Sequence, residues 1–525
     1  MTGPRSPILL PRWDLNPVVI KELRQAVRNW FVVGVLLLLL LILFVAMVMY
    51  VLTESIGATS NPTLGRSVFQ VFFGILSVGS MVFIPGYTGT RFAKEREEAN
   101  LDLMFITTLT PGQIIRGKIL GGVILTGLFF SVFMPFMAFT YLLRGIDLPS
   151  MFVVLVMNFI VVAAMIHLAV FLACLPVSRN FKVGIAAGTF FFGMIWLGGL
   201  TFGAFELIGS GVGSRLGSWD FWGPTLTFLV AAALVMRVLY IAAVALITAP
   251  SANRALPVRV NTTLCFLVAA AIPLLWEYFS GGGSGSSGVS EKISAVFGLP
   301  LLAVCLIVCV SSHDKLSLRI RRTIPTSRLK RALAFVFYSG AAGGLVWCAL
   351  LAGCILGLGV LALGGSSSGS VSLGRMTISA MSGTMTPGGS DWLVFVSVVA
   401  YFFAYALTGL YLHRRFWSTR PPKLAGIAAV IVPLLFGVIP TLVLFFLNRF
   451  TSTSLDKFMP GNIFNLFVRN AEANATLHFM VAAAWAAFML ALNARWFFRQ
   501  FAAFTNYLPA GEKAADGSTL PPILD

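Results

Sequence analysis

The chain has 525 residues, of which 58% are hydrophobic and 11% charged, and 37 Lys and Arg against 19 Asp and Glu give a formal net charge of +18. A soluble protein averages about 25% charged residues, and the mean hydropathy here is +0.90. This composition excludes a soluble enzyme, a disordered protein and a disulfide-stapled secreted domain. It predicts an all-α polytopic membrane protein.

Twelve stretches are apolar enough to cross a bilayer, since a spanning helix needs about 20 predominantly apolar residues. We expect spans at 30–52, 67–90, 119–143, 151–176, 183–208, 221–248, 261–279, 293–311, 332–362, 392–413, 424–447 and 475–494. They suggest a 6+6 arrangement, with units at 30–248 and 261–499. A helix within 1–29, a joint at 249–260 and a tail at 500–525 complete the chain.

The basic residues alternate between the predicted loops. Twenty-eight of the 37 fall on the side of the N-terminus and eight on the opposite side. By the positive-inside rule, both termini are expected in the cytoplasm. The charge excess therefore reflects topology, and we expect no nucleic-acid partner. Only Arg237 sits well inside a span, where it lines a cavity or, as we favour, snorkels toward the cytoplasmic face.

The cytoplasmic stretch from Arg91 to Lys118 carries the most information. Its first half gathers charges beside apolar residues, which predicts a short surface helix with one apolar edge; these residues are Glu95, Arg96, Glu97, Glu98 and Asp102 beside Leu101, Met104 and Phe105. After a turn at Thr107–Thr110, Thr110 as N-cap, Pro111 at the first helical position and Gln113 as capping-box partner predict a new helix. That helix should run into the third span.

The N-terminal segment also has helical periodicity. Its apolar residues Ile20, Leu23, Val27 and Trp30 recur at a spacing of three to four, and Lys21, Glu22, Arg24 and Arg28 occupy the other face. This pattern predicts an amphipathic helix ahead of the first span.

These motifs resemble those of ABC-2 type transporter permeases. The resemblance rests on Glu95-Arg96-Glu97-Glu98-x-x-Leu101-Asp102-Leu103, on Leu109-Thr110-Pro111-x-Gln113-Ile114-Ile115-x-Gly117-Lys118, and on the opening Asn16-Pro17-Val18-Val19-Ile20-Lys21-Glu22-Leu23-Arg24-Gln25. It implies a coupling helix at about 91–110 that docks on a nucleotide-binding subunit. The implied coupling residues are Glu95, Arg96, Glu97, Glu98, Leu101, Asp102, Leu103, Thr107, Pro111, Gly117 and Lys118. The implied connecting-helix residues are Asn16, Pro17, Lys21, Glu22, Leu23 and Arg24. Ala99-Asn100 and Thr108 depart from the family pattern, where Gly-Thr and Pro are common.

The resemblance implies the permease subunit of an ATP-driven exporter in the bacterial cytoplasmic (inner) membrane. Such a subunit is not an enzyme and binds no cofactor, because ATP and Mg²⁺ belong to a separate cytosolic ATPase. Its other partners are the lipid bilayer and, in a homodimer or pseudo-dimer, a second permease unit. The stretch Gly112–Lys118 matches the start of a phosphate-binding loop, but Ile119 stands where Ser or Thr should hold Mg²⁺.

Two other classes remain open from the sequence. Twelve spans in a 6+6 arrangement also suit an ion-coupled secondary transporter, but the 91–118 loop lacks that superfamily's motif and the spans lack midplane carboxylates. A non-catalytic membrane scaffold is the third class. His167 and His478 are interpreted as hydrogen-bonded core residues, and the six cysteines as buried apolar residues rather than metal ligands. We therefore expect neither a metal site nor a catalytic residue.

Overall fold

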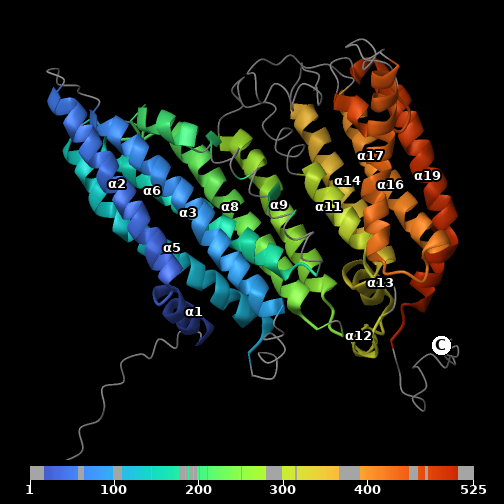
Figure 1. Ribbon diagram of the computed structural model, residues 1–525. Coiled ribbons are helices and arrows are strands. Elements are labelled where there is room, and N and C mark those ends of the chain that lie inside the picture. Colours follow the sequence, from blue (N-terminus) through green and yellow to red (C-terminus); the bar gives the residue numbers. More distant parts are fainter. Residues whose placement is uncertain are drawn as a thin grey trace, which may run out of the picture. The chain divides into compact units, whose positions relative to one another are not determined.

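The computed structural model describes residues 17–56, 64–97, 109–143, 145–176, 201–209, 211–213, 215–249, 251–279, 298–313, 316–365, 391–447, 459–467 and 471–506, with isolated positions between 184 and 199. Every regular element within these ranges is a helix (Figure 1). Residue contacts divide the chain into unit 1, Met1–Thr248, and unit 2, Ala249–Asp525.

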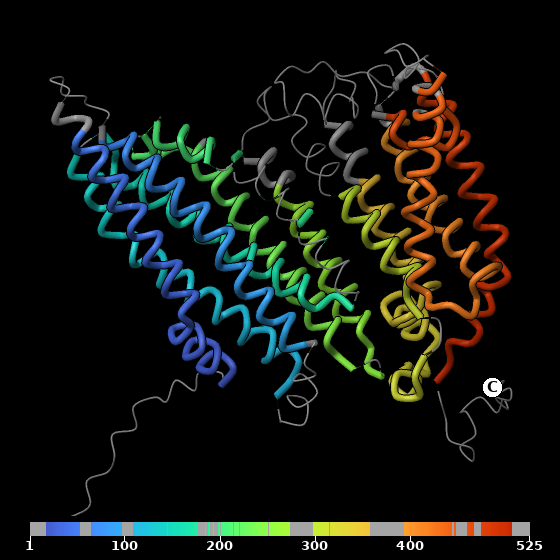
Figure 2. The backbone as a smooth tube through the Cα atoms, viewed as in Figure 1, coloured from blue at the N-terminus to red at the C-terminus, as the bar shows by residue number. Residues whose placement is uncertain are grey.

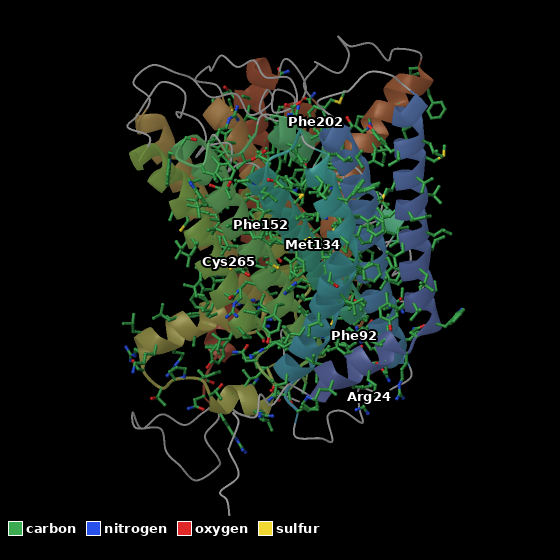
Figure 3. The ribbon with its side chains drawn as sticks, turned by 90° about the vertical axis from the view of Figure 1, so that its left-hand side faces the viewer. Arg24, Phe92, Met134, Phe152, Phe202 and Cys265 are labelled. Carbon is green, nitrogen blue, oxygen red and sulfur yellow. The ribbon has the colours of Figure 1, made fainter. Side chains whose placement is uncertain are left out.

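Unit 1 is a bundle of long helices with one short helix at its end. The helices are α1 (Pro17–Val27), α2 (Trp30–Ile56), α3 (Leu64–Glu97), α5 (Pro111–Leu142), α6 (Leu148–Cys174) and α8 (Trp219–Ile247). Helix α3 packs on α5 and α6, α6 packs on α8, and α1 lies on α5. Figure 3 places Arg24 and Phe92 at one end of this bundle, which we call the α1 end, and Phe202 at the other.

Two helices of unit 1 are longer than a bilayer requires. Helix α3 has 34 residues and α5 has 32, which at a rise of 1.5 Å per residue gives each about 50 Å. The hydrocarbon core of a membrane is only about 30 Å thick. Several turns therefore project beyond it.

The end of α3 differs from the sequence expectation. We expected the second span to end near residue 90 and a separate surface helix to follow. Instead, α3 runs without a break to Glu97, as its continuous trace in Figure 2 shows. No Gly or Pro follows Gly89 within the helix to interrupt the backbone hydrogen bonds. Arg91, Glu95 and Arg96 thus belong to the last two turns of α3, and residues 98–108 lie outside the described part.

Unit 2 has more elements of unequal length. They are α9 (Ala255–Phe279), α11 (Leu299–Val310), α12 (Leu318–Arg322), α13 (Arg328–Phe337), α14 (Ala341–Gly365), α16 (Asp391–Phe416), α17 (Lys423–Phe446), the 3₁₀ helix η2 (Ile463–Phe467) and α19 (Ala471–Ala503). Helix α16 packs closely on both α17 and α19 and forms the centre of the unit's core.

An elbow replaces the straight ninth span that the sequence predicted at 332–362. Helices α13 and α14 meet at 87°, and Gly340 between them has a φ of 137°, which favours glycine. Arg259 of α9 stabilises this elbow. Arg259 is 4% exposed, and its guanidinium donates to the carbonyls of Val336 at 2.8 Å, Tyr338 at 2.6 Å and Gly340 at 2.9 Å.

Nine helices in the described ranges are long and apolar enough to cross a membrane, or ten if α13 and α14 form one bent span. The chain is thus an all-helical, multi-pass membrane protein. The expected fifth span, 183–208, lies mostly outside those ranges. The expected eighth corresponds to α11, which has only 12 residues.

Both histidines are hydrogen-bonded as interpreted, although only His478 is fully buried and His167 is half-buried, and the cysteine interpretation needs one correction. His478 is fully buried and bonds Tyr401 Oη at 3.1 Å and Asn465 Oδ1 at 2.8 Å, while His167 Nδ1 bonds the Ala163 carbonyl at 2.8 Å. Five cysteines are buried, but Cys354 is exposed. A position within an apolar span does not distinguish a side chain packed on protein from one that faces lipid.

We predict that Arg259→Ala lowers the free energy of unfolding of unit 2 by about 2–4 kcal/mol, because it leaves buried carbonyls without a donor. Arg259→Lys should rescue only part of this loss, since an ammonium cannot reproduce the planar fork of a guanidinium. Thermal unfolding of the full chain in detergent measures both. The account of the elbow is wrong if Arg254→Ala, which removes a single longer bond to Ala249, lowers the midpoint as much.

Candidate functional site

The candidate site lies at the α1 end of unit 1, where α1, α3 and α5 meet. Helix α1 is amphipathic, as the sequence predicted. Its packing differs from the expected pattern, because Val18, Val19 and Ala26 are buried, while the expected apolar row at Ile20, Val27 and Trp30 is 44%, 59% and 83% exposed. An exposed apolar row at a span's end suits the membrane interface.

A capping box fixes where α5 begins, as predicted. The Thr110 hydroxyl accepts from the Gln113 amide at 3.4 Å, and the Gln113 side chain accepts from the Thr110 amide at 2.8 Å. Pro111 is the first helical residue. This defined start sets the position of Lys118, which lies two turns further along α5.

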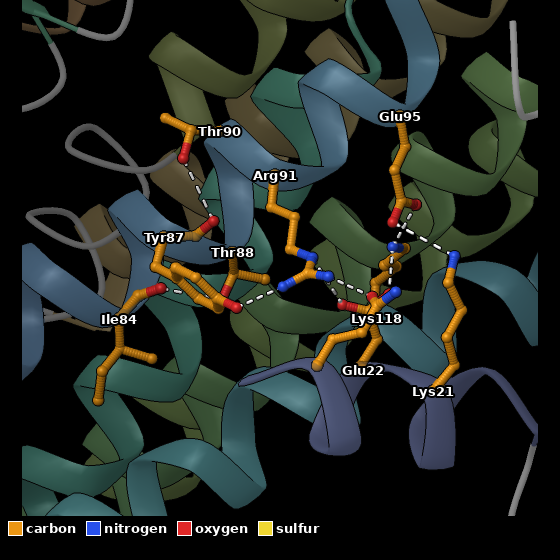
Figure 4. Close-up of polar contacts among 10 residues, drawn as sticks. Lys21, Glu22, Ile84, Tyr87, Thr88, Thr90, Arg91, Glu95 and Lys118 are labelled. Atoms are coloured by element: carbon orange, nitrogen blue, oxygen red, sulfur yellow. Dashed lines mark hydrogen bonds and ion pairs between the residues drawn. The ribbon is translucent and has the colours of Figure 1, made fainter. Parts of the chain in front are cut away.

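Lys118 is the centre of the site. Its side chain is 2% exposed, and its ammonium lies 2.5 Å from Glu22 Oε1 of α1 and 2.5 Å from Glu95 Oε2 of α3 (Figure 4). The ammonium also lies 5.4 Å from the centre of the Phe92 ring, within the range of a cation–π contact. One buried cation therefore joins three helices.

Two further cations complete what we call the Lys118 cluster, namely Lys118, Glu22, Glu95, Lys21 and Arg91. Lys21 Nζ lies 3.4 Å from Glu95 Oε1, and Arg91 Nε lies 3.8 Å from Glu22 Oε2. Each carboxylate thus meets two cations, and the cluster carries one net positive charge. This pairing offsets the cost of removing these groups from water.

The sequence did not indicate the outer contacts of this cluster. Arg91 donates to the Tyr87 hydroxyl and to the Gln25 side chain. Tyr87, Arg91 and Glu95 lie four residues apart and so share one face of α3. That four-residue spacing was the signal available in the sequence, and the face of α3 that it defines contacts α1. A groove of about 1,110 Å³ borders this face and is lined by residues of α1, α2 and α3.

The close approach of α1 to α5 needs a residue without a side chain. A Cβ on Gly121 of α5 would lie 3.0 Å from the Cβ of Glu22. Glycine here lets the backbones approach closely, as is common between membrane helices. The Glu22 carboxylate can then reach Lys118, three residues earlier on α5.

The remaining expected coupling residues do not all join the cluster. Arg96 donates to the Ala173 carbonyl at 3.2 Å near the end of α6, and Gly117 is buried in α5. Pro17 begins α1, Leu23 is half-buried and Arg24 is exposed. Asn16, Glu98, Leu101, Asp102, Leu103 and Thr107 lie outside the described residues, as does the Glu97 side chain.

Arg237 lies apart from the cluster, on an exposed position of α8. It precedes Tyr240 by three residues, or about 4.5 Å along the helix. The Tyr240 hydroxyl accepts from Arg116 Nε at 2.9 Å and donates to the Gly112 carbonyl at 3.4 Å. Arg237 itself lies ten residues, or about 15 Å, before Ile247 at the end of α8, and both the cavity and the snorkelling interpretation stay predictions.

The described residues contain no group of three or more His, Cys, Asp or Glu arranged to hold a metal ion. The charged groups of the Lys118 cluster pair with one another. The role that this geometry supports is therefore to hold three helices together. Comparison of the chain with known protein families, with curated proteins and with solved structures finds no match.

We predict that Lys118→Met lowers the free energy of unfolding by about 3–5 kcal/mol, because each of the two carboxylates loses the nearer of its two cations and keeps only a more distant one. Adding Glu22→Gln and Glu95→Gln to that variant should recover part of the loss, since neither carboxylate charge then has to stay buried without Lys118. The measurement is thermal unfolding of the full chain in detergent. Lys94→Met, which removes an exposed lysine at the neighbouring end of α3, is the control, and equal destabilisation by both would refute the cluster's role.

Proposed function

We propose that this protein is the membrane-spanning permease subunit of an ABC-2 type exporter, driven by a separate cytosolic ATPase. The observation that supports the proposal best is the buried Lys118, which ties together α1, the end of α3 and the start of α5. These are the three segments whose sequences resemble the family's connecting helix and coupling region. Their union gives a partner one rigid body to move.

The proposed mechanism follows the chain. Residues 98–109 connect Glu97, the last residue of α3, to the N-cap of α5 at Thr110. In the proposal, the ATPase docks on this connection and shifts it when it closes on ATP. Because Glu95 and Lys118 link the two helix ends, α3 and α5 move together, and Glu22 carries α1 with them. The work enters as a difference in the partner's affinity for two permease states.

The topology forms part of the same proposal. It places the α1 end in the cytoplasm of a bacterial inner-membrane protein with twelve spans and both termini inside. The distribution of basic residues between the loops supports this orientation. ATP and Mg²⁺ would then bind only to the partner.

Affinity purification of the full chain from its native membranes in mild detergent tests the proposal. An ATPase with a phosphate-binding loop should copurify, and the chain alone should hydrolyse no ATP. The charge reversals Glu97→Lys and Glu98→Lys should reduce the recovered ATPase at least tenfold. Asp456→Lys, in a loop expected on the opposite side, is the matched control. Absence of any such ATPase, or equal loss in the control, would reject the proposal.

A further inference from the structure

A cavity lies inside unit 1, away from the Lys118 cluster. It has a volume of about 800 Å³ and is bounded by α3, α6, α8 and the helical residues 201–209. Its walls are mainly apolar, with Phe73 and Met81 on α3 and Phe221 and Phe228 on α8. Pockets that bind small molecules have volumes of about 300–1,000 Å³ and apolar walls with a few polar groups.

Two polar side chains interrupt the apolar wall. Ser77 of α3 is 1% exposed and Asn158 of α6 is 4% exposed. Among the residues that the structure describes, the Ser77 hydroxyl and both polar atoms of the Asn158 amide find no hydrogen-bond partner. Buried polar groups are nearly always paired, and leaving them unpaired lowers stability. Both residues line the cavity. Their unpaired atoms are themselves buried, so a molecule inside the cavity can supply the missing partners once these side chains turn toward it.

A cation lies at the rim of the cavity. Arg215 lines the cavity from the segment ahead of α8 and is exposed. That segment is anchored to the start of α6, because Asp147 Oδ2 accepts from the Gly213 amide at 3.0 Å and the Ser150 hydroxyl accepts from the Val212 amide at 2.7 Å. Asp147 also accepts from the Ser150 amide at 3.2 Å. These backbone donors compensate the Asp147 charge, and Arg215 supplies a positive charge at the rim with which an anionic group can pair.

The polar groups occupy two levels. Asn158 lies eleven residues after Asp147 on α6, or about 16 Å deeper along the helix. Between these levels the wall offers apolar surface. A ligand that satisfies both levels needs an anionic head, an apolar chain and a hydrogen-bonding group well along that chain.

We propose that this cavity binds a single-chain anionic amphiphile whose chain carries a hydroxyl group. The head group pairs with Arg215, the chain lies against Phe73, Met81 and Phe228, and the hydroxyl bonds Asn158 and Ser77. A hydroxyl both donates and accepts, so it can pair with the Asn158 carbonyl and with an amide or hydroxyl donor. The proposal goes beyond the exporter function, because the site would bind this ligand with or without an ATPase partner.

Equilibrium binding of ricinoleate to the purified full chain tests the proposal. Oleate differs from ricinoleate by lacking the hydroxyl, and methyl ricinoleate lacks the charge. We expect ricinoleate to bind about fivefold more tightly than oleate, as one net hydrogen bond predicts. Methyl ricinoleate should bind several-fold more weakly than ricinoleate. Equal affinities of ricinoleate and oleate would overturn the proposal and indicate that water or a plain acyl chain fills the cavity.

Variants locate the preference within the cavity. Asn158→Leu should abolish the preference for ricinoleate and leave oleate affinity unchanged, and without ligand it should melt at no lower temperature, since an unpaired amide is removed. Ser77→Ala should reduce the preference in part. Ser80→Ala, one turn along α3 and bonded to the Ser77 carbonyl, is the matched control and should retain it. A preference that persists in both Asn158→Leu and Ser77→Ala would overturn the proposal, whatever the result of the ATPase copurification.

Discussion

The buried ammonium of Lys118 sets the constraint on which the α1 end of unit 1 depends. A charge with 2% exposure is stable only with close counter-charges, and here Glu22 and Glu95 each lie 2.5 Å away. The two carboxylates come from different helices, so neither α1 nor the end of α3 can move away from α5 without exposing an unpaired charge. Three segments that would otherwise be separate surface elements therefore form one body.

In unit 2 a buried cation also holds helices together, but its partners are backbone carbonyls and not carboxylates. Arg259 binds three carbonyls where the chain turns from α13 into α14, and Phe335 of α13 contacts Phe497, Phe501 and Phe504. The elbow is thereby held from two sides. In both units, a buried basic side chain fixes an amphipathic helix against the end of the bundle, which a hydrophobic contact alone would position less specifically.

Local signals in the sequence predicted local structure well. The Thr110–Gln113 capping box and the apolar runs depend on residues a few positions apart, and the capping box and most of the runs lie where expected. The Lys118 pairs could not be predicted, because 96 and 23 residues separate their members and the pairing depends on how closely α1 approaches Gly121. The exposed row at Ile20 was missed for another reason: in a membrane protein, an apolar face can meet lipid as well as protein. At the ninth span, Gly340 marks the position where the helix breaks. It was not recognised in the sequence because mostly apolar residues surround it.

The central claim is that the segment between α3 and α5 transmits a partner's motion to the Lys118 cluster. Photocrosslinking in intact cells tests it most directly, with p-benzoylphenylalanine placed singly at position 101 or 105 and, as a control, at position 457 in a loop expected on the opposite side. The account predicts a crosslink from 101 or 105 to an ATPase with a phosphate-binding loop, and none from 457. Crosslinks to no such ATPase, or the same product from all three positions, would contradict it.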